Sequence, residues 1–145
     1  MPFLVWDATS RQYGLGKGLA VKEIKKVTFR KLAEVFNSVE AKKDELVEAG
    51  ERALVSLYRG SDEERLDTLR YQKFSESIKG ATHVEPQTLP TTFAASVYHS
   101  LLVYYQIMQW KGGQMSMNPE EWGWHVVDGK YLPKQTDKAP APLSC

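Results

Sequence analysis

The feature that most constrains the fold is residues 86–110, a stretch without a single Asp, Glu, Lys or Arg. A helix that is apolar around most of its circumference must be buried in protein or in lipid. Polar side chains interrupt this stretch, and each would need a partner in hydrocarbon: Ser96, His99, Ser100, Gln106 and Gln109. We therefore expect a buried central helix over about residues 91–110, after Leu89-Pro90, and no membrane span.

Helical spacing of apolar residues runs from Lys17 to Lys111 and predicts about five helices in all. The four before the central helix are expected over residues 18–26, from Thr28 past Phe36, and over 41–58 and 61–79. In the third, Gly50 lowers helix propensity and indicates a close crossing with another helix. Ser61 and Glu64 have the spacing of a capping box, which would open the fourth.

The expected fold class is therefore all-α, a compact multi-helix domain over residues 1–132. Asp128-Gly129 lies between two short apolar runs and predicts a tight hairpin near the C-terminus. Residues 133–145 are rich in Pro and Ala and are expected to form an extended, flexible tail.

Charge is distributed unevenly along the chain, although the net charge is only +1. Residues 1–43 carry nine Lys and Arg against four Asp and Glu, whereas residues 44–145 carry ten against fourteen. The N-terminal part is thus the plausible contact for a polyanion. The single cysteine, Cys145, excludes an intramolecular disulfide, and an intracellular location, nuclear or cytoplasmic, is expected.

No pattern for nucleophilic or zinc chemistry stands out. Cys145 falls in the expected tail, and the three histidines show no metal-ligand spacing. His99 on the central helix is interpreted as a hydrogen-bonded structural residue. The acids of residues 62–67 gather where a helix is expected to begin, and the helix dipole accounts for them better than a metal site does.

The run Gly14-Leu15-Gly16-Lys17-Gly18 is either an ordinary helix-start turn or a phosphate site. It lacks the spacing of a dinucleotide fingerprint and of a P-loop. In helix–hairpin–helix elements, however, a Gly-x-Gly backbone faces a phosphate, and amides at the next helix N-terminus donate to its oxygens. Arg30 and Lys31 would add to the attraction. The predicted phosphate-binding residues are Gly14, Gly16, Lys17, Gly18, Lys22, Lys25 and Lys26.

This segment resembles the flap-endonuclease-like (PIN-like) nucleases, in which a late metal-binding Asp opens a helix–turn–helix. The family pattern Asp-x6-Gly-x-Gly-x3-Ala is matched here by Asp7, Gly14, Gly16 and Ala20. The chain is more closely similar to uncharacterised, transposon-derived animal proteins whose PIN-like domain continues into a helical region. Further matches to these proteins extend along nearly the whole chain: Asp7-Ala8-Thr9-Ser10, Ala49-Gly50-Glu51, Leu57-Tyr58, Leu69-Arg70-Tyr71, Leu89-Pro90, His99-Ser100-Leu101, Tyr104-Tyr105-Gln106 and Trp122-Gly123-Trp124.

The resemblance implies the C-terminal helical part of a PIN-like domain, with Asp7 as a metal-binding residue. Trp6 and Ala8 depart from the family, whose members usually have Cys and Thr there. Nucleases of this class hold divalent metals such as Mg between several converging acids. Asp7 alone cannot do so unless another chain supplies the missing half. We therefore expect a non-catalytic helical remnant without a cofactor, which binds DNA or RNA backbones weakly and without reading sequence.

Two alternatives remain open. In the first, the glycine turn is only structural, and an apolar surface pairs with a second copy or with a missing partner segment. The apolar residues 2–6 favour that interpretation, because they would otherwise need burial. The chain would then be a self-association or protein-interaction module with no nucleic-acid binding. In the second, the chain is an active metal-dependent nuclease.

Overall fold

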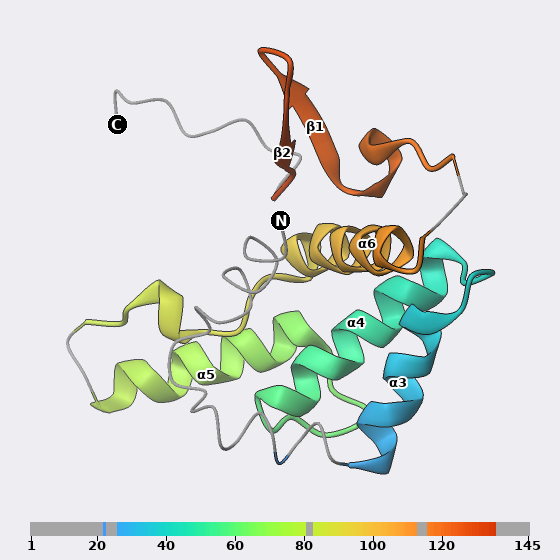
Figure 1. Cartoon of the computed structure of the whole chain (residues 1–145). Helices are drawn as coiled ribbons and strands as arrows, with labels where there is room; N and C mark the ends of the chain where they lie inside the picture. Colours follow the sequence, from blue (N-terminus) through green and yellow to red (C-terminus); the bar gives the residue numbers. More distant parts are fainter. Residues whose placement is uncertain (1–21, 23–25, 81–82, 113–115, 136–145) are drawn as a thin grey trace.

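The structure is a computed structural model that describes residues 22, 26–80, 83–112 and 116–135. The elements of these residues, in chain order, are shown in Figure 1: α3 (Val27–Asn37), α4 (Lys43–Leu57), α5 (Leu66–Gly80), the 3₁₀ helix η1 (Pro86–Thr88), α6 (Phe93–Trp110), the 3₁₀ helix η2 (Pro119–Trp122), β1 (Trp124–Val127) and β2 (Lys130–Pro133).

The described part of the chain is mostly helical and carries one small hairpin, as the sequence predicts. It contains four α-helices, fewer than the five or so expected for the chain. The helix expected over residues 18–26 lies mostly outside the described residues. The helix expected from Thr28 begins slightly earlier, because Lys26 rather than Thr28 is the N-cap of α3.

Helix α6 occupies the centre of the fold, as expected from its lack of charge. In Figure 1 it lies between the hairpin on one side and α3 and α4 on the other, and it contacts α3, α4 and η2. Its buried apolar side chains are Leu101, Leu102, Tyr104 and Met108. Within the part of the chain that is described, every helix falls short of the length and apolarity needed to cross a membrane.

The polar side chains of α6 are accommodated locally. The Ser96 hydroxyl donates to the Phe93 carbonyl at 2.7 Å, and the Ser100 hydroxyl donates to the Ser96 carbonyl at 2.8 Å. Both serines are buried, so these bonds remove the free-energy penalty of leaving a hydroxyl without a partner. Small side chains also let a neighbouring helix approach. A Cβ on Gly50 of α4 would lie 1.9 Å from the Ser100 Oγ, which confirms the predicted close crossing.

The start of α5 differs from the expectation. Ser61 and Glu64 do form a reciprocal turn, since the Ser61 N–H donates to the Glu64 Oε2 at 3.1 Å and the Glu64 N–H donates to the Ser61 carbonyl at 3.1 Å. The helix itself begins only at Leu66. There the buried Glu51 of α4 accepts from the Leu66 N–H at 2.9 Å, so a residue from another helix provides the cap.

The predicted hairpin is present. Asp128 and Gly129 have φ angles of 50° and 73°, the left-handed conformations that a tight two-residue turn needs, and Val127 pairs with Lys130. Strand β2 continues through Pro133, and the Lys134 N–H donates to the Gly123 carbonyl at 2.8 Å. Residues 133 and 134 therefore belong to the hairpin rather than to the expected tail.

Candidate functional site

Two of the predicted phosphate-binding residues, Lys22 and Lys26, lie in the described part of the chain, and both are exposed. The others, Gly14, Gly16, Lys17, Gly18 and Lys25, fall outside the described residues, and so does the candidate metal ligand Asp7. The structure thus describes only the end of the predicted site that adjoins α3.

The N-terminal end of α3 presents a cluster of cations to solvent. Lys26 precedes the helix in an extended conformation, with φ and ψ of −66° and 143°, and no acidic residue occurs in the first turn. Arg30 and Lys31 are exposed. The apolar side chains Phe29, Leu32, Ala33 and Phe36 are half-buried, so α3 packs through one side and leaves its cations on the other. We call Lys22, Lys26, Arg30 and Lys31 the basic edge.

The basic edge has the electrostatic character that an anion requires. A helix N-terminus carries partial positive charge from amide groups that have no partner within the helix. In many helices an acidic side chain in the first turn neutralises that charge, but α3 has none. The two lysines and the Arg30 and Lys31 side chains add full positive charges at the same end. Phosphate is the biological anion that such a combination most often accepts.

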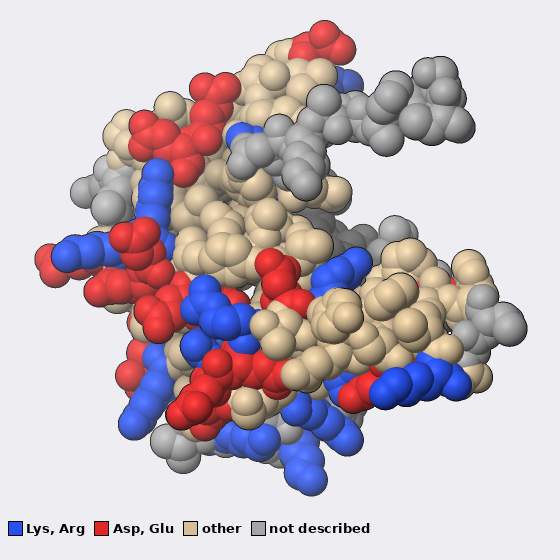
Figure 2. Space-filling view, turned by 180° about the vertical axis from the view of Figure 1, so that it is seen from behind, with Lys and Arg blue, Asp and Glu red and all other residues tan. Residues whose placement is uncertain are grey.

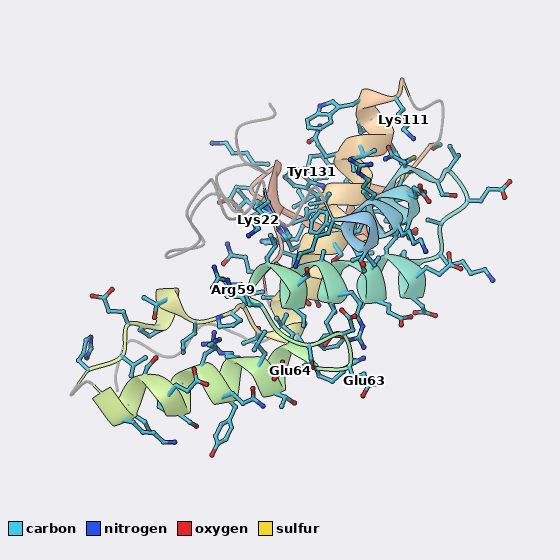
Figure 3. All side chains as sticks on the ribbon, turned by 90° about the horizontal axis from the view of Figure 1, so that it is seen from below. Lys22, Arg59, Glu63, Glu64, Lys111 and Tyr131 are labelled. Atoms are coloured by element: carbon cyan, nitrogen blue, oxygen red, sulfur yellow. The ribbon has the colours of Figure 1, made fainter. Side chains whose placement is uncertain are left out.

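Arg59 is a further exposed cation, which the sequence did not single out. In Figure 3, Lys22 and Arg59 lie near one another beside the same end of α4, whereas Lys111 lies well away from both. Arg59 follows α4 with a φ of 61°, and its N–H donates to the Ser56 carbonyl at 3.0 Å. Glycine is the residue that most often takes a left-handed conformation after a helix, and Gly60 is the next residue, so nothing in the local pattern marked Arg59 for that conformation.

Acidic side chains limit how far this positive surface extends. Figure 3 shows Glu63 and Glu64 on the opposite side of α4 from Lys22. In Figure 2, blue side chains reach the lower edge of the molecule, and red side chains lie directly above several of them. The positive surface is therefore a narrow edge suited to a few phosphates rather than a broad groove for a long duplex.

The described residues include no group of three or more His, Cys, Asp or Glu side chains that could hold a metal ion. Two of the acids in residues 62–67 have structural partners: Glu64 in its turn, and Asp67, whose Oδ1 accepts from the Phe93 N–H at 2.9 Å. Of the acids of residues 62–67, only Asp67 lies in the first turn of α5, as expected. The helix begins at Leu66, so Asp62, Glu63 and Glu64 precede it. His99 is half-buried on α6, and burial lowers its pKa below the ordinary value.

A second surface, on α5, was not predicted. Its buried side chains are Leu66 and Leu69, both near its start, whereas Tyr71, Phe74 and Ile78 are 71%, 41% and 51% exposed. These three residues follow the helical spacing of a single stripe. A groove of about 450 Å³ runs beside the stripe and is lined by Asp67, Arg70, Tyr71, Phe74, Val84, Pro86 and Leu89. We call the stripe and this groove together the α5 surface.

Comparisons with known proteins return nothing for this chain: no protein-family model, no curated protein and no solved structure matches it.

Proposed function

We propose that this chain is a non-catalytic helical module that binds the phosphate backbone of DNA or RNA without reading base sequence. The observation that supports the proposal is the basic edge, four exposed cations within or shortly before the first turns of α3, a helix that has no acid in its first turn. The resemblance to the PIN-like nucleases, which implies a phosphate-binding glycine turn before the helix expected over residues 18–26, next to α3 in the chain, supports the same function. Under this proposal the chain descends from a nuclease. It retains the phosphate-binding turn but not the group of converging acids that would hold metal ions together with Asp7.

The expected binding is weak and depends strongly on salt. Each phosphate neutralised by a Lys or Arg releases a condensed counterion, so the logarithm of the binding constant falls by about 0.9 per contact for each decade of salt. For about four contacts, one per residue of the basic edge, the affinity falls on the order of 100-fold between 50 and 200 mM salt. Because backbone contacts carry no sequence information, AT-rich and GC-rich duplexes should bind alike.

Fluorescence anisotropy with a labelled mixed-sequence duplex, titrated at these two salt concentrations, tests the proposal. The wild-type chain should bind in the micromolar range at 50 mM salt. A variant with Lys22→Glu, Lys25→Glu and Lys26→Glu should bind at least tenfold more weakly and show a shallower salt dependence. A matched control carries the same charge change at three exposed lysines elsewhere, as Lys79→Glu, Lys111→Glu and Lys130→Glu.

The control variant keeps binding within about threefold of wild type if position matters more than net charge. Equal losses in both variants would mean that binding follows net charge alone, and absence of binding at 50 mM salt would overturn the proposal. The non-catalytic part has its own test: magnesium-dependent cleavage of the duplex that is lost in Asp7→Ala would identify an active nuclease instead.

A second candidate function has support from a different observation. The exposed stripe of the α5 surface favours a module that binds another protein or a second copy of itself. The two functions need different side chains, since the basic edge lies on α3 and the stripe lies on α5. Each can therefore be removed by substitution without changing the other.

A further inference from the structure

Helix α5 leaves the core after its first turns. Leu66 and Leu69 join Leu54 and Val55 of α4 in one hydrophobic cluster. Beyond them no residue of α5 is buried, and Figure 1 shows the C-terminal part of α5 extending away from α4. Figure 2 shows a largely uncharged surface at the lower right, where α5 and the segment after it lie. A helix that projects with an apolar stripe in water needs a covering partner to be favourable.

We infer that a second copy of this chain covers the α5 surface, with the two α5 helices packed antiparallel about a two-fold axis. The inference rests on the second candidate function and names its partner. A two-fold interface must be self-complementary, because the same patch serves both subunits. The α5 surface meets that condition. It offers projecting side chains in Tyr71, Phe74 and Ile78, and beside them an apolar groove whose far wall is Val84, Pro86 and Leu89.

Charge also favours the antiparallel arrangement. The first turn of α5 carries Asp67 and its last turn carries Lys79, while Glu63 is exposed just before the helix. When two copies run antiparallel, the acidic start of each helix meets the basic end of the other. The helix dipoles oppose one another in the same arrangement. A parallel pair would instead place these like charges together. The cations near the start of α5, Arg65 and Arg70, already contact the Glu51 carboxylate and the Pro90 carbonyl, so Asp67 and Lys79 favour the antiparallel orientation.

The size of the surface sets the expected strength. Helix α5 has 15 residues, and a helix of that size is about 22 Å long. Tyr71, Phe74 and Ile78 are already partly covered, so together they can remove on the order of 300 Å² of surface per copy, compared with about 150–250 Å² for each fully exposed aromatic side chain. Stable complexes bury about 800 Å² per partner. We therefore expect a reversible dimer with a dissociation constant in the micromolar range, populated at high protein concentration.

Sedimentation velocity of the full chain from about 5 to 200 µM tests this inference. The wild-type mass should rise from one copy to two across that range. Phe74→Asp places a charge in the middle of the stripe and should keep the chain monomeric throughout. Far-UV circular dichroism should stay unchanged in this variant, because the Phe74 side chain is 41% exposed and outside the core clusters.

A matched control is Val127→Asp, which places the same charge on the hairpin. Val127 is 42% exposed, about as much as Phe74. This control should dimerise like wild type. Loss of the dimer in Val127→Asp but not in Phe74→Asp would place self-association on the hairpin and overturn the inference. A chain that stays monomeric at every concentration would overturn it as well.

A charge-reversal pair tests the orientation. Lys79→Glu should weaken the dimer at least tenfold. Thr68→Lys in the same chain should restore much of the loss, because the exposed residue 68 of one copy lies beside residue 79 of the other when the two-fold axis passes Phe74. Failure of the second substitution to restore any affinity would overturn the antiparallel arrangement. Both results are measured as the mass of the protein in solution, so they do not depend on nucleic-acid binding. The Phe74→Asp variant should still bind the duplex, so dimerisation and nucleic-acid binding can fail independently of one another.

Discussion

Gly50 of α4 and Ser100 of α6 are in contact where the two helices cross: a Cβ on Gly50 would lie 1.9 Å from the Ser100 Oγ and 3.0 Å from its Cβ. No other glycine of the described residues has a neighbour so close to the position of a Cβ. The Ser100 hydroxyl cannot easily turn aside, because it donates to the Ser96 carbonyl and is buried. The two central helices therefore approach through two small residues, and the rest of the α4–α6 packing depends on that approach.

Gly50→Ala should destabilise the protein by about 1–3 kcal/mol, the usual effect of overpacking a core, despite the better helix propensity of Ala. Chemical denaturation gives the free energy of unfolding. Gly80→Ala is the matched control, since a Cβ there would meet nothing within 4 Å, and it should be neutral or slightly stabilising. Adding Ser100→Gly to Gly50→Ala should recover part of the loss, and no recovery would mean that the contact is not the cause.

Glu51 should be among the least replaceable side chains of α4. It is 1% exposed, accepts from the Leu66 N–H, and pairs with Arg65 at 3.1 Å. Glu51→Ala should lower the free energy of unfolding by about 3 kcal/mol, because it leaves a buried N–H without an acceptor and opens a cavity. Glu51→Gln keeps an acceptor and should lose less. Glu48→Ala on the exposed side of the same helix should change stability little, and an equal effect of both alanines would contradict this role.

Tyr104 joins α6 to the end of α3. Its ring is buried, and its hydroxyl donates to the Ser38 carbonyl at 2.9 Å and lies 3.1 Å from the Val39 carbonyl. Tyr104→Phe keeps the ring and removes the donor, so the free energy of unfolding should fall by about 1–2 kcal/mol. Thermal unfolding followed by circular dichroism measures it. Tyr71→Phe, on an exposed ring, serves as the control and should leave the midpoint unchanged.

His99 should make stability fall as the solution becomes acidic. Burial lowers its pKa from the ordinary value of 6.5. The unfolded chain therefore binds a proton near pH 6.5 that the folded chain binds only at lower pH. The contribution of His99 to the free energy of unfolding is therefore complete above pH 6.5. It is lost as the pH falls toward the folded-state pKa, by at most about 1.4 kcal/mol per pH unit.

Thermal unfolding at pH 7.5 and pH 5.5 checks this expectation. His99→Gln should show a smaller difference between the two pH values than wild type does. His83→Gln replaces an exposed histidine and should keep the wild-type difference. A His99→Gln variant with an unchanged pH dependence would show that other groups account for it.

The parts of the fold that could be predicted are those set by local sequence. The uncharged stretch identified α6 as central, the Asp128-Gly129 pair identified the hairpin, and Gly50 identified a helix crossing. The start of α5 could not be found in this way, because its cap comes from Glu51, fifteen residues earlier in the chain. A local capping box at Ser61 and Glu64 is real, but it closes a turn rather than the helix.

The candidate sites show a similar division. Runs of Lys and Arg in the sequence marked the basic edge, whereas Arg59 depends on how the end of α4 is placed. The stripe on α5 could not be predicted, because apolar residues lie on several sides of this helix and only the packing decides which of them α4 covers. Trp110 shows the same limit: it ends the central helix and is 55% exposed, whereas Tyr104 of the same helix is 1% exposed.

Glu51 and Asp67 act at successive junctions, since each carboxylate accepts from the first backbone N–H of the next long helix, Leu66 for α5 and Phe93 for α6. Disturbing one helix start thus loosens the next, and α4, α5 and α6 should open together as one cooperative unit. Amide hydrogens at the Leu66 end of α5 would then be replaced by deuterium only when the whole protein unfolds. Amide hydrogens around Ile78, which lies beyond the last buried residue of α5, would exchange through local fraying of the helix end, which needs little free energy.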